Sequence, residues 1–194
     1  MARTSFLLAQ QPVWLENRPG SRHYIPENIQ SWVYESGSLT QRLRSRYGSS
    51  VAVNILFHQW ATPLLSERKL LAVPEHRYAL VREVMLHASG KPLLLARTII
   101  PEATLKGVHR NLSHLGTRPL GEVIFSYPKL ERLALGVTLI QPTTWSESAI
   151  ALAAIHQPIW GRRTVYAIAG RSMLVSEFFL PEILYQFSSY EASR

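Results

Sequence analysis

The chain has 194 residues, of which 46% are hydrophobic and 18% charged, and its formal net charge is +8. This composition is typical of a globular domain with a sizeable core and excludes a disordered chain. No apolar run reaches membrane-spanning length, and the absence of cysteine excludes disulfides, thiol catalysis and Cys-ligated zinc. We therefore expect one domain over residues 1–194, a monomer without a membrane span, in the cytoplasm.

The N-terminal part of the chain predicts two helices after an irregular start. Residues 1–25 contain several proline and glycine breakers and predict an irregular segment. Helices are predicted over Glu27–Tyr34 and Leu39–Tyr47, and Ser38 is a suitable N-cap for the second.

Apolar alternation predicts about six strands. In the first of them Val51, Val53, Ile55 and Phe57 share one face by strict alternation. The predicted strands span Val51–Trp60, Arg77–His87, Pro92–Ile100, Leu130–Leu139, Arg162–Ala169 and Met173–Leu180. Short turns at 88–91 and 170–172 join two pairs of strands as hairpins, so the pairing should be antiparallel.

The remaining segments predict helices between the strands. Residues 102–115 change to a helical pattern with a break at Gly107, and 120–125 predict a short helix. Residues 140–158 have a helical centre and predict an insertion or flap, and 185–194 predict a polar tail. The pattern therefore predicts an α+β fold, a single antiparallel sheet flanked by helices.

Three charged residues fall on apolar strand faces. Arg82 shares a face with Leu80 and Val84, Arg97 lies in the next strand, and Glu177 lies in an almost wholly apolar one. The opposite face of the Arg82 strand, which holds Glu83, is mixed and suits partial exposure. The inward charges could form a buried salt bridge, which is weak evidence of stability. Alternatively they could form a site in which arginine holds a carboxylate and the glutamate accepts a hydroxyl or moves a proton.

Motifs of other functional classes are missing. The sequence has no GxGxxG or Walker-type loop, no HExxH and no GxSxG elbow, and it contains no aspartate. We therefore expect no metal and no cofactor. Basic residues cluster only at 42–46 and 162–163, without a long tract, so the charge indicates a basic surface or the steering of a small anion, and not a nucleic-acid partner.

Two predicted helix starts offer backbone groups to an anion. Leu39 follows Ser38, and Leu120 precedes Gly121, so each leucine lies where free N–H groups begin a helix. Both positions could equally be ordinary helix starts with apolar side chains.

Six short motifs occur in an order and spacing that resemble the chorismate lyase family. They are GSLTQRL at 37–43, YALVREVML at 78–86, ARTIIP at 96–101, LGTRPLG at 115–121, WGRR at 160–163 and LVSEFFLP at 174–181. The resemblance implies an antiparallel sheet with a closed site beneath helical flaps, here 102–115. It also implies a carbon–oxygen lyase that converts chorismate to 4-hydroxybenzoate and pyruvate, for quinone biosynthesis, without metal or organic cofactor.

The resemblance also implies roles for individual residues. Arg82 would hold the ring carboxylate and Glu177 would contact the ring hydroxyl, both as catalytic residues, while Leu39 and Leu120 would bind the carboxylate end through their backbones. Candidates for a second anion contact are Arg97, Arg162 and Arg163. Acid–base elimination in steps and internal proton transfer both remain open. The fold also occurs in sensor domains of bacterial transcription regulators, so a non-catalytic sensor of an aromatic acid is the alternative.

Overall fold

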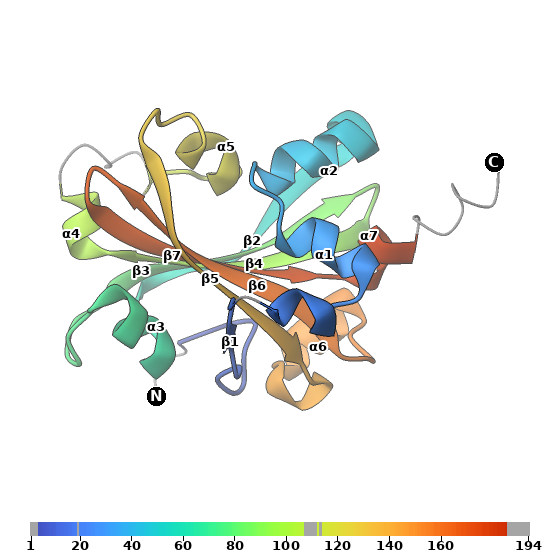
Figure 1. Ribbon diagram of the computed structural model, residues 1–194, viewed down its shortest axis with the longest axis horizontal. Helices are drawn as coiled ribbons and strands as arrows, with labels where there is room; N and C mark the ends of the chain where they lie inside the picture. Colours follow the sequence, from blue (N-terminus) through green and yellow to red (C-terminus); the bar gives the residue numbers. More distant parts are fainter. Residues whose placement is uncertain (1–3, 19, 107–111, 113, 186–194) are drawn as a thin grey trace.

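A computed structural model of the protein describes every residue except 1–3, 19, 107–111, 113 and 186–194. In this part of the chain, seven strands form one antiparallel sheet in the order β1-β5-β6-β7-β4-β3-β2 (Figure 1). The strands are β1 (Leu15–Glu16), β2 (Val51–Ala61), β3 (Ala79–Ala88), β4 (Lys91–Pro101), β5 (Leu130–Ile140), β6 (Ile159–Ile168) and β7 (Arg171–Phe179). The α-helices are α1 (Glu27–Val33), α2 (Leu39–Tyr47), α3 (Leu65–Leu71), α4 (Glu102–Leu105), α5 (Leu120–Ile124), α6 (Glu147–Ala153) and α7 (Pro181–Tyr185).

The predicted α+β class is confirmed, with one strand more than expected. The additional strand, β1, lies in the segment 1–25 that was predicted to be irregular, and it pairs with β5 at the edge of the sheet. A 3-10 helix follows at Ser21–Tyr24. Two residues carry too little pattern to be recognised as a strand, so only the pairing with β5 reveals β1.

The two hairpins close through two-residue turns. The loop residues Ser89 and Gly90 have φ of 49° and 80°, and Ala169 and Gly170 have φ of 50° and 71°. Positive φ at both central positions is the requirement of the type I′ turn, whose twist matches that of the flanking strands. The second turn lies at 169–170, one residue before the predicted 170–172, so Arg171 already belongs to β7.

A bulge interrupts the predicted alternation of β2. The register with β3 shifts between Ile55, which lies opposite Val84, and Phe57, which lies opposite Glu83. Phe57 is therefore buried on the other face from Val53, and Ile55 is 40% exposed. The prediction that Val51, Val53, Ile55 and Phe57 share a face is confirmed as far as Ile55 and wrong at Phe57, because one extra residue reverses the direction of every later side chain.

Helices cover both faces of the sheet (Figure 1). Helices α1 and α2 lie on one face together with α5, and their apolar residues pack against β3, β4, β6 and β7. The opposite face is covered by α3, α6 and Leu7–Leu8 of the N-terminal segment. The segment 140–158, predicted to be an insertion or flap, contains α6 and packs with Trp145 and Ile155 on this second face.

Candidate active site

Strand register brings Arg82 and Glu177 to the same face of the sheet. Arg82 of β3 lies opposite Thr98 of β4, which lies opposite Val175 of β7, two residues from Glu177. Two strand spacings and a two-residue offset separate the Cα atoms of Arg82 and Glu177 by roughly 12 Å. This separation leaves room for an aromatic ring between the two side chains.

A small pocket lies between this face and the first turns of α2 and α5. It has a volume of about 40 Å³, enough for only a few water molecules. Its lining contains all four predicted substrate-binding residues and is otherwise mostly apolar. The lining residues are Leu39, Thr40, Val53, Arg82, Val84, Leu86, Leu94, Ala96, Thr98, Pro119, Leu120, Gly121, Ile124, Phe125, Tyr166, Val175 and Glu177.

Arg82 is a buried cation at one end of this pocket. Its side chain is 1% exposed, and Nη2 donates hydrogen bonds to the carbonyl oxygens of Gly116 at 3.0 Å and Arg118 at 3.1 Å. Among the described residues no carboxylate pairs with it, and its buried Nε donates no hydrogen bond. Burial lowers the pKa of Arg82 to about 10. A guanidinium held in this way is suited to receive an anion.

Glu177 is paired, but with Arg162 and not with Arg82. Arg162 Nε donates to Glu177 Oε2 at 2.7 Å, and the Glu177 side chain is 13% exposed. Arg162 Nη1 also donates to the carbonyls of Trp32, Val33 and Glu35, so it caps the end of α1. Burial has the largest single effect and lowers the pKa of Arg162, but Glu177, Tyr166 and Glu35 together raise it by more, so the guanidinium stays charged.

The first residues of α2 and α5 meet above the pocket. Leu39 and Leu120 are the first residues of these helices, so their N–H groups have no partner within the helix. Ser38 caps α2 by accepting from the Gln41 N–H at 3.4 Å. A Cβ at Gly121 would lie 2.8 Å from Ser38 Oγ, so a larger residue at this position would displace the capping hydroxyl or separate the two helices.

Tyr166 is a pocket residue that the sequence reasoning did not single out. It is 2% exposed, and its hydroxyl accepts a hydrogen bond from Arg132 Nη2 at 3.3 Å. Its ring meets that of Phe125 edge-on at 5.8 Å. Burial, followed by the charge of Glu177, raises the pKa of Tyr166, so the phenol stays protonated near neutral pH. Alternation along β6 from Arg162 places Tyr166 on the same face and is the signal that could have identified it.

The other two arginines proposed for a second anion contact do not reach the pocket. Arg97 lies opposite Glu83 and Ser176, and Arg163 lies opposite Ser176 in the next strand, so both lie on the face away from Arg82. The expectation that they contact a ligand of this pocket is therefore wrong. One residue of offset along a strand decides which face a side chain occupies.

Arg97 belongs to a buried ionic cluster on that second face. It donates to Glu67 Oε1 at 2.7 Å and to Glu83 Oε1 at 2.6 Å. Glu83 also accepts from the backbone N–H of Phe6 and Leu7, so the cluster fastens the N-terminal segment to the sheet. Glu83 has no exposed surface, and the prediction of partial exposure for its face is wrong, because α3 and residues 5–8 cover it.

Three other expectations concern metal binding, a membrane span and the helical flap. Within the described residues no group of three or more histidine or glutamate side chains could hold a metal ion. None of the helices described is both long and apolar enough to span a bilayer. The predicted flap 102–115 is described at α4 and at Leu112, which packs in the apolar cluster around Tyr166, but 107–111 and 113 lie outside the described residues.

Comparison with known proteins decides the family. The family model for chorismate lyase matches residues 8–189 of the chain. The chain belongs to the chorismate lyase family. Two relatives named "Probable chorismate pyruvate-lyase" support this assignment. The relative from Methylococcus capsulatus is 43% identical over 156 residues, 80% of this chain and 96% of the relative. The relative from Aromatoleum aromaticum is 36% identical over 175 residues, 88% and 93% of the two chains.

Solved structures with the same fold are distant in sequence from this member of the chorismate lyase family. PhnF from Mycobacterium smegmatis superposes with a TM-score of 0.56 at 16% identity, over 78% of this chain and 67% of PhnF. A GntR-family transcriptional regulator from Bacillus cereus gives 0.54 at 15% identity, over 69% and 94%. These likenesses show a shared fold and no shared activity.

Proposed function

We propose that this protein is a chorismate lyase that eliminates pyruvate from chorismate to give 4-hydroxybenzoate for quinone biosynthesis. The observation that carries the proposal is that Arg82, a buried cation with which no described carboxylate pairs, lines one pocket with Glu177, about the length of a ring away. The family of the chain supplies the chemical context, and the pocket supplies groups that suit both ends of the ring.

At one end of the pocket, Arg82 binds the ring carboxylate. The N–H groups at the starts of α2 and α5, at Leu39 and Leu120, have no partner within their helices and supply further donors beside it. Arg82 is already desolvated, so binding an anion there recovers an electrostatic interaction in a low-dielectric site. The apolar lining then holds the ring in one plane and excludes water.

At the other end, Glu177 accepts a hydrogen bond from the ring hydroxyl. The bond between the ring and the enolpyruvyl oxygen breaks, and its electron pair leaves on oxygen. The ring carbon that carries the hydroxyl loses its proton, which ends on the departing fragment and yields pyruvate. Aromatisation drives the reaction, so the residues mainly need to orient the substrate and exclude solvent. Arg162 holds Glu177 in place through the hydrogen bond from Nε to Oε2.

The pocket must open for a ligand of this size. A volume of about 40 Å³ is too small for a substituted ring, so the walls have to separate before binding. The first turns of α2 and α5 form the part of the wall outside the sheet. Movement of these two short helices is therefore the simplest way to open the pocket.

The test is direct turnover. Purified protein mixed with chorismate in the presence of EDTA should yield 4-hydroxybenzoate and pyruvate in equal amounts, followed by ultraviolet absorbance and by a coupled lactate dehydrogenase assay. Binding of 4-hydroxybenzoate with chorismate left intact would instead identify a sensor of an aromatic acid. Salt-dependent affinity for DNA without either result would indicate a nucleic-acid partner.

A further inference from the structure

A polar network extends from Glu177 to Tyr166 along one side of the pocket. Arg162 binds Glu177 and donates to the Glu35 carbonyl at 2.7 Å. Arg132 Nη2 donates to the same carbonyl at 2.9 Å and to the Tyr166 hydroxyl at 3.3 Å. The Arg132 guanidinium thus lies close to a hydroxyl of the pocket wall and close to the Glu177 pair.

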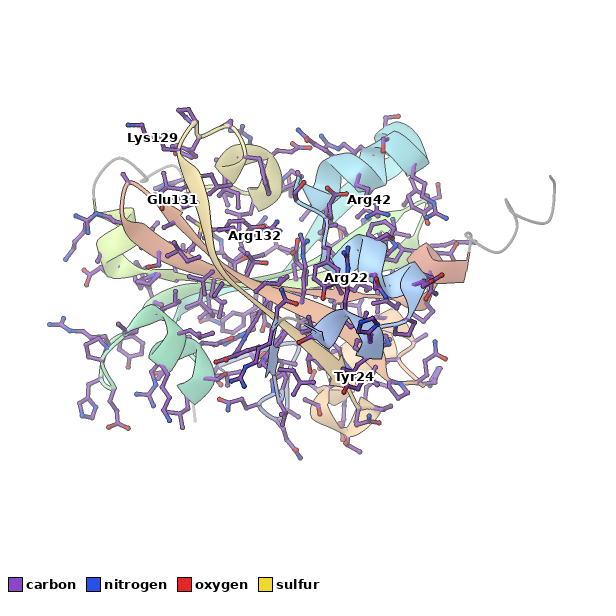
Figure 2. All side chains as sticks on the ribbon, viewed as in Figure 1. Arg22, Tyr24, Arg42, Lys129, Glu131 and Arg132 are labelled. Atoms are coloured by element: carbon purple, nitrogen blue, oxygen red, sulfur yellow. The ribbon has the colours of Figure 1, made fainter. Side chains whose placement is uncertain are left out.

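The guanidinium of Arg132 has a charge that no described carboxylate balances and N–H groups that could still donate hydrogen bonds. Within the described residues it pairs with no carboxylate, and Nη2 is the only one of its nitrogens that donates a hydrogen bond. The Tyr166 hydroxyl accepts from Arg132 but donates to no described group. Figure 2 shows Arg132 on β5 beside the gap between that strand and the α1–α2 segment, whereas Lys129, near the start of β5, extends outward.

The substrate of the proposed reaction has a second carboxylate that needs a cation. Its enolpyruvyl ether is on the ring carbon next to the one that carries the hydroxyl. If Glu177 binds that hydroxyl and Arg82 the ring carboxylate, the second carboxylate lies near Glu177, far from Arg82. The charge of Arg162 is already balanced by Glu177, and Arg97 and Arg163 lie on the other face. Arg132 is then the arginine that remains near this end of the pocket in the described residues.

We propose that Arg132, together with the Tyr166 hydroxyl, binds the enolpyruvyl carboxylate of the substrate. This proposal rests on the proposed function and adds a second anion site to it. The product 4-hydroxybenzoate lacks the enolpyruvyl group, so the site distinguishes substrate from product. A pocket that holds the product only through Arg82 and Glu177 binds it without help from Arg132.

The experiment compares substrate and product in the same variants. Steady-state kinetics with chorismate and calorimetric titration with 4-hydroxybenzoate are measured for wild type, Arg132→Gln, Tyr166→Phe and the matched control Lys129→Gln. Arg132→Gln should raise KM about tenfold with kcat nearly unchanged, because a charge-assisted hydrogen bond formed equally in both states is lost. Tyr166→Phe should raise KM about threefold. Both variants should bind 4-hydroxybenzoate within twofold of wild type, and Lys129→Gln should match wild type in both assays.

Two results would overturn the proposal. An unchanged KM in Arg132→Gln, or equal losses of substrate and product affinity, excludes a site specific to the enolpyruvyl group while wild-type turnover still supports the lyase. Absence of turnover by wild type refutes the lyase function itself and this site with it. If Arg132→Gln fails to fold, which loss of its circular dichroism spectrum would reveal, the Tyr166→Phe comparison decides the question alone.

Discussion

Replacing Arg82 by methionine should stabilise the free protein while abolishing its activity. The pKa of a buried arginine falls well below that of an arginine in water, and each pKa unit corresponds to about 1.4 kcal/mol. The pKa of Arg82 is lowered to about 10 by burial, so keeping it charged in the fold costs about 3 kcal/mol. Because the folded pKa lies below the unfolded one, this destabilisation is present in full at pH 7 and disappears only as the pH rises above 10.

Methionine fills a similar space without a charge. The variant loses two hydrogen bonds to the carbonyls of Gly116 and Arg118, but both residues are exposed and water can replace the guanidinium. If the loss of these hydrogen bonds costs about 1 kcal/mol, it offsets part of the roughly 3 kcal/mol gained by removing the buried charge. Arg82→Met then has a free energy of unfolding about 2 kcal/mol higher than wild type. For a chain of this length the midpoint of thermal unfolding rises by roughly 4–8 °C.

The assay is thermal and urea unfolding at pH 7, with and without 4-hydroxybenzoate. The matched control is Arg162→Met on the same face, which leaves Glu177 unpaired and should lower stability by about 3–5 kcal/mol. The ligand should stabilise wild type but not Arg82→Met. If Arg82→Met is instead destabilised as strongly as Arg162→Met, Arg82 stabilises the fold, and the claim that its buried charge destabilises the free protein is refuted.

Three further variants test other parts of the structure. Glu177→Gln should lower kcat/KM for chorismate about 100-fold or more in the coupled assay while the circular dichroism spectrum is retained, and undiminished turnover would contradict its role. Gly121→Ala places a Cβ 2.8 Å from Ser38 Oγ and disturbs the cap of α2. Urea unfolding should therefore show a free energy of unfolding lower by about 1 kcal/mol, and calorimetry a weaker affinity for 4-hydroxybenzoate. Gly37→Ala is the control and should match wild type in both measurements. Glu83→Gln should lower the free energy of unfolding by about 3 kcal/mol at unchanged KM, and a raised KM would show that the two faces are coupled.

Much of the fold follows from local patterns. The helix Leu39–Tyr47 is predicted to the residue, because Ser38 caps its start and Gly48 ends it. The hairpin strands are predicted to within about three residues, because apolar alternation and a glycine turn are both local signals. The bulge in β2 could not be predicted, because an extra residue becomes visible only when the partner strand is in place.

The candidate site, like the fold, has features that local sequence patterns predict and others that depend on how the strands pair. The alternation of apolar residues around Arg82 and Glu177 indicates two inward charges, and the quoted motifs indicate their family. Which cation faces which anion depends on the registers of β3, β4, β6 and β7. These registers pair Glu177 with Arg162 and direct Arg97 to Glu67 and Glu83.

The sequence by itself determined the class of the fold, the inward charges and the family, because periodicity, capping and short motifs are properties of neighbouring residues. Tertiary structure alone decided that Arg82 has no acidic partner within the described part of the chain and that Tyr166 and Arg132 lie beside the Glu177 end of the pocket. The physical reason is that ion pairing and burial depend on contacts between strands far apart in the chain. A shift of one residue in any of these strands would exchange the two faces and give each arginine different neighbours.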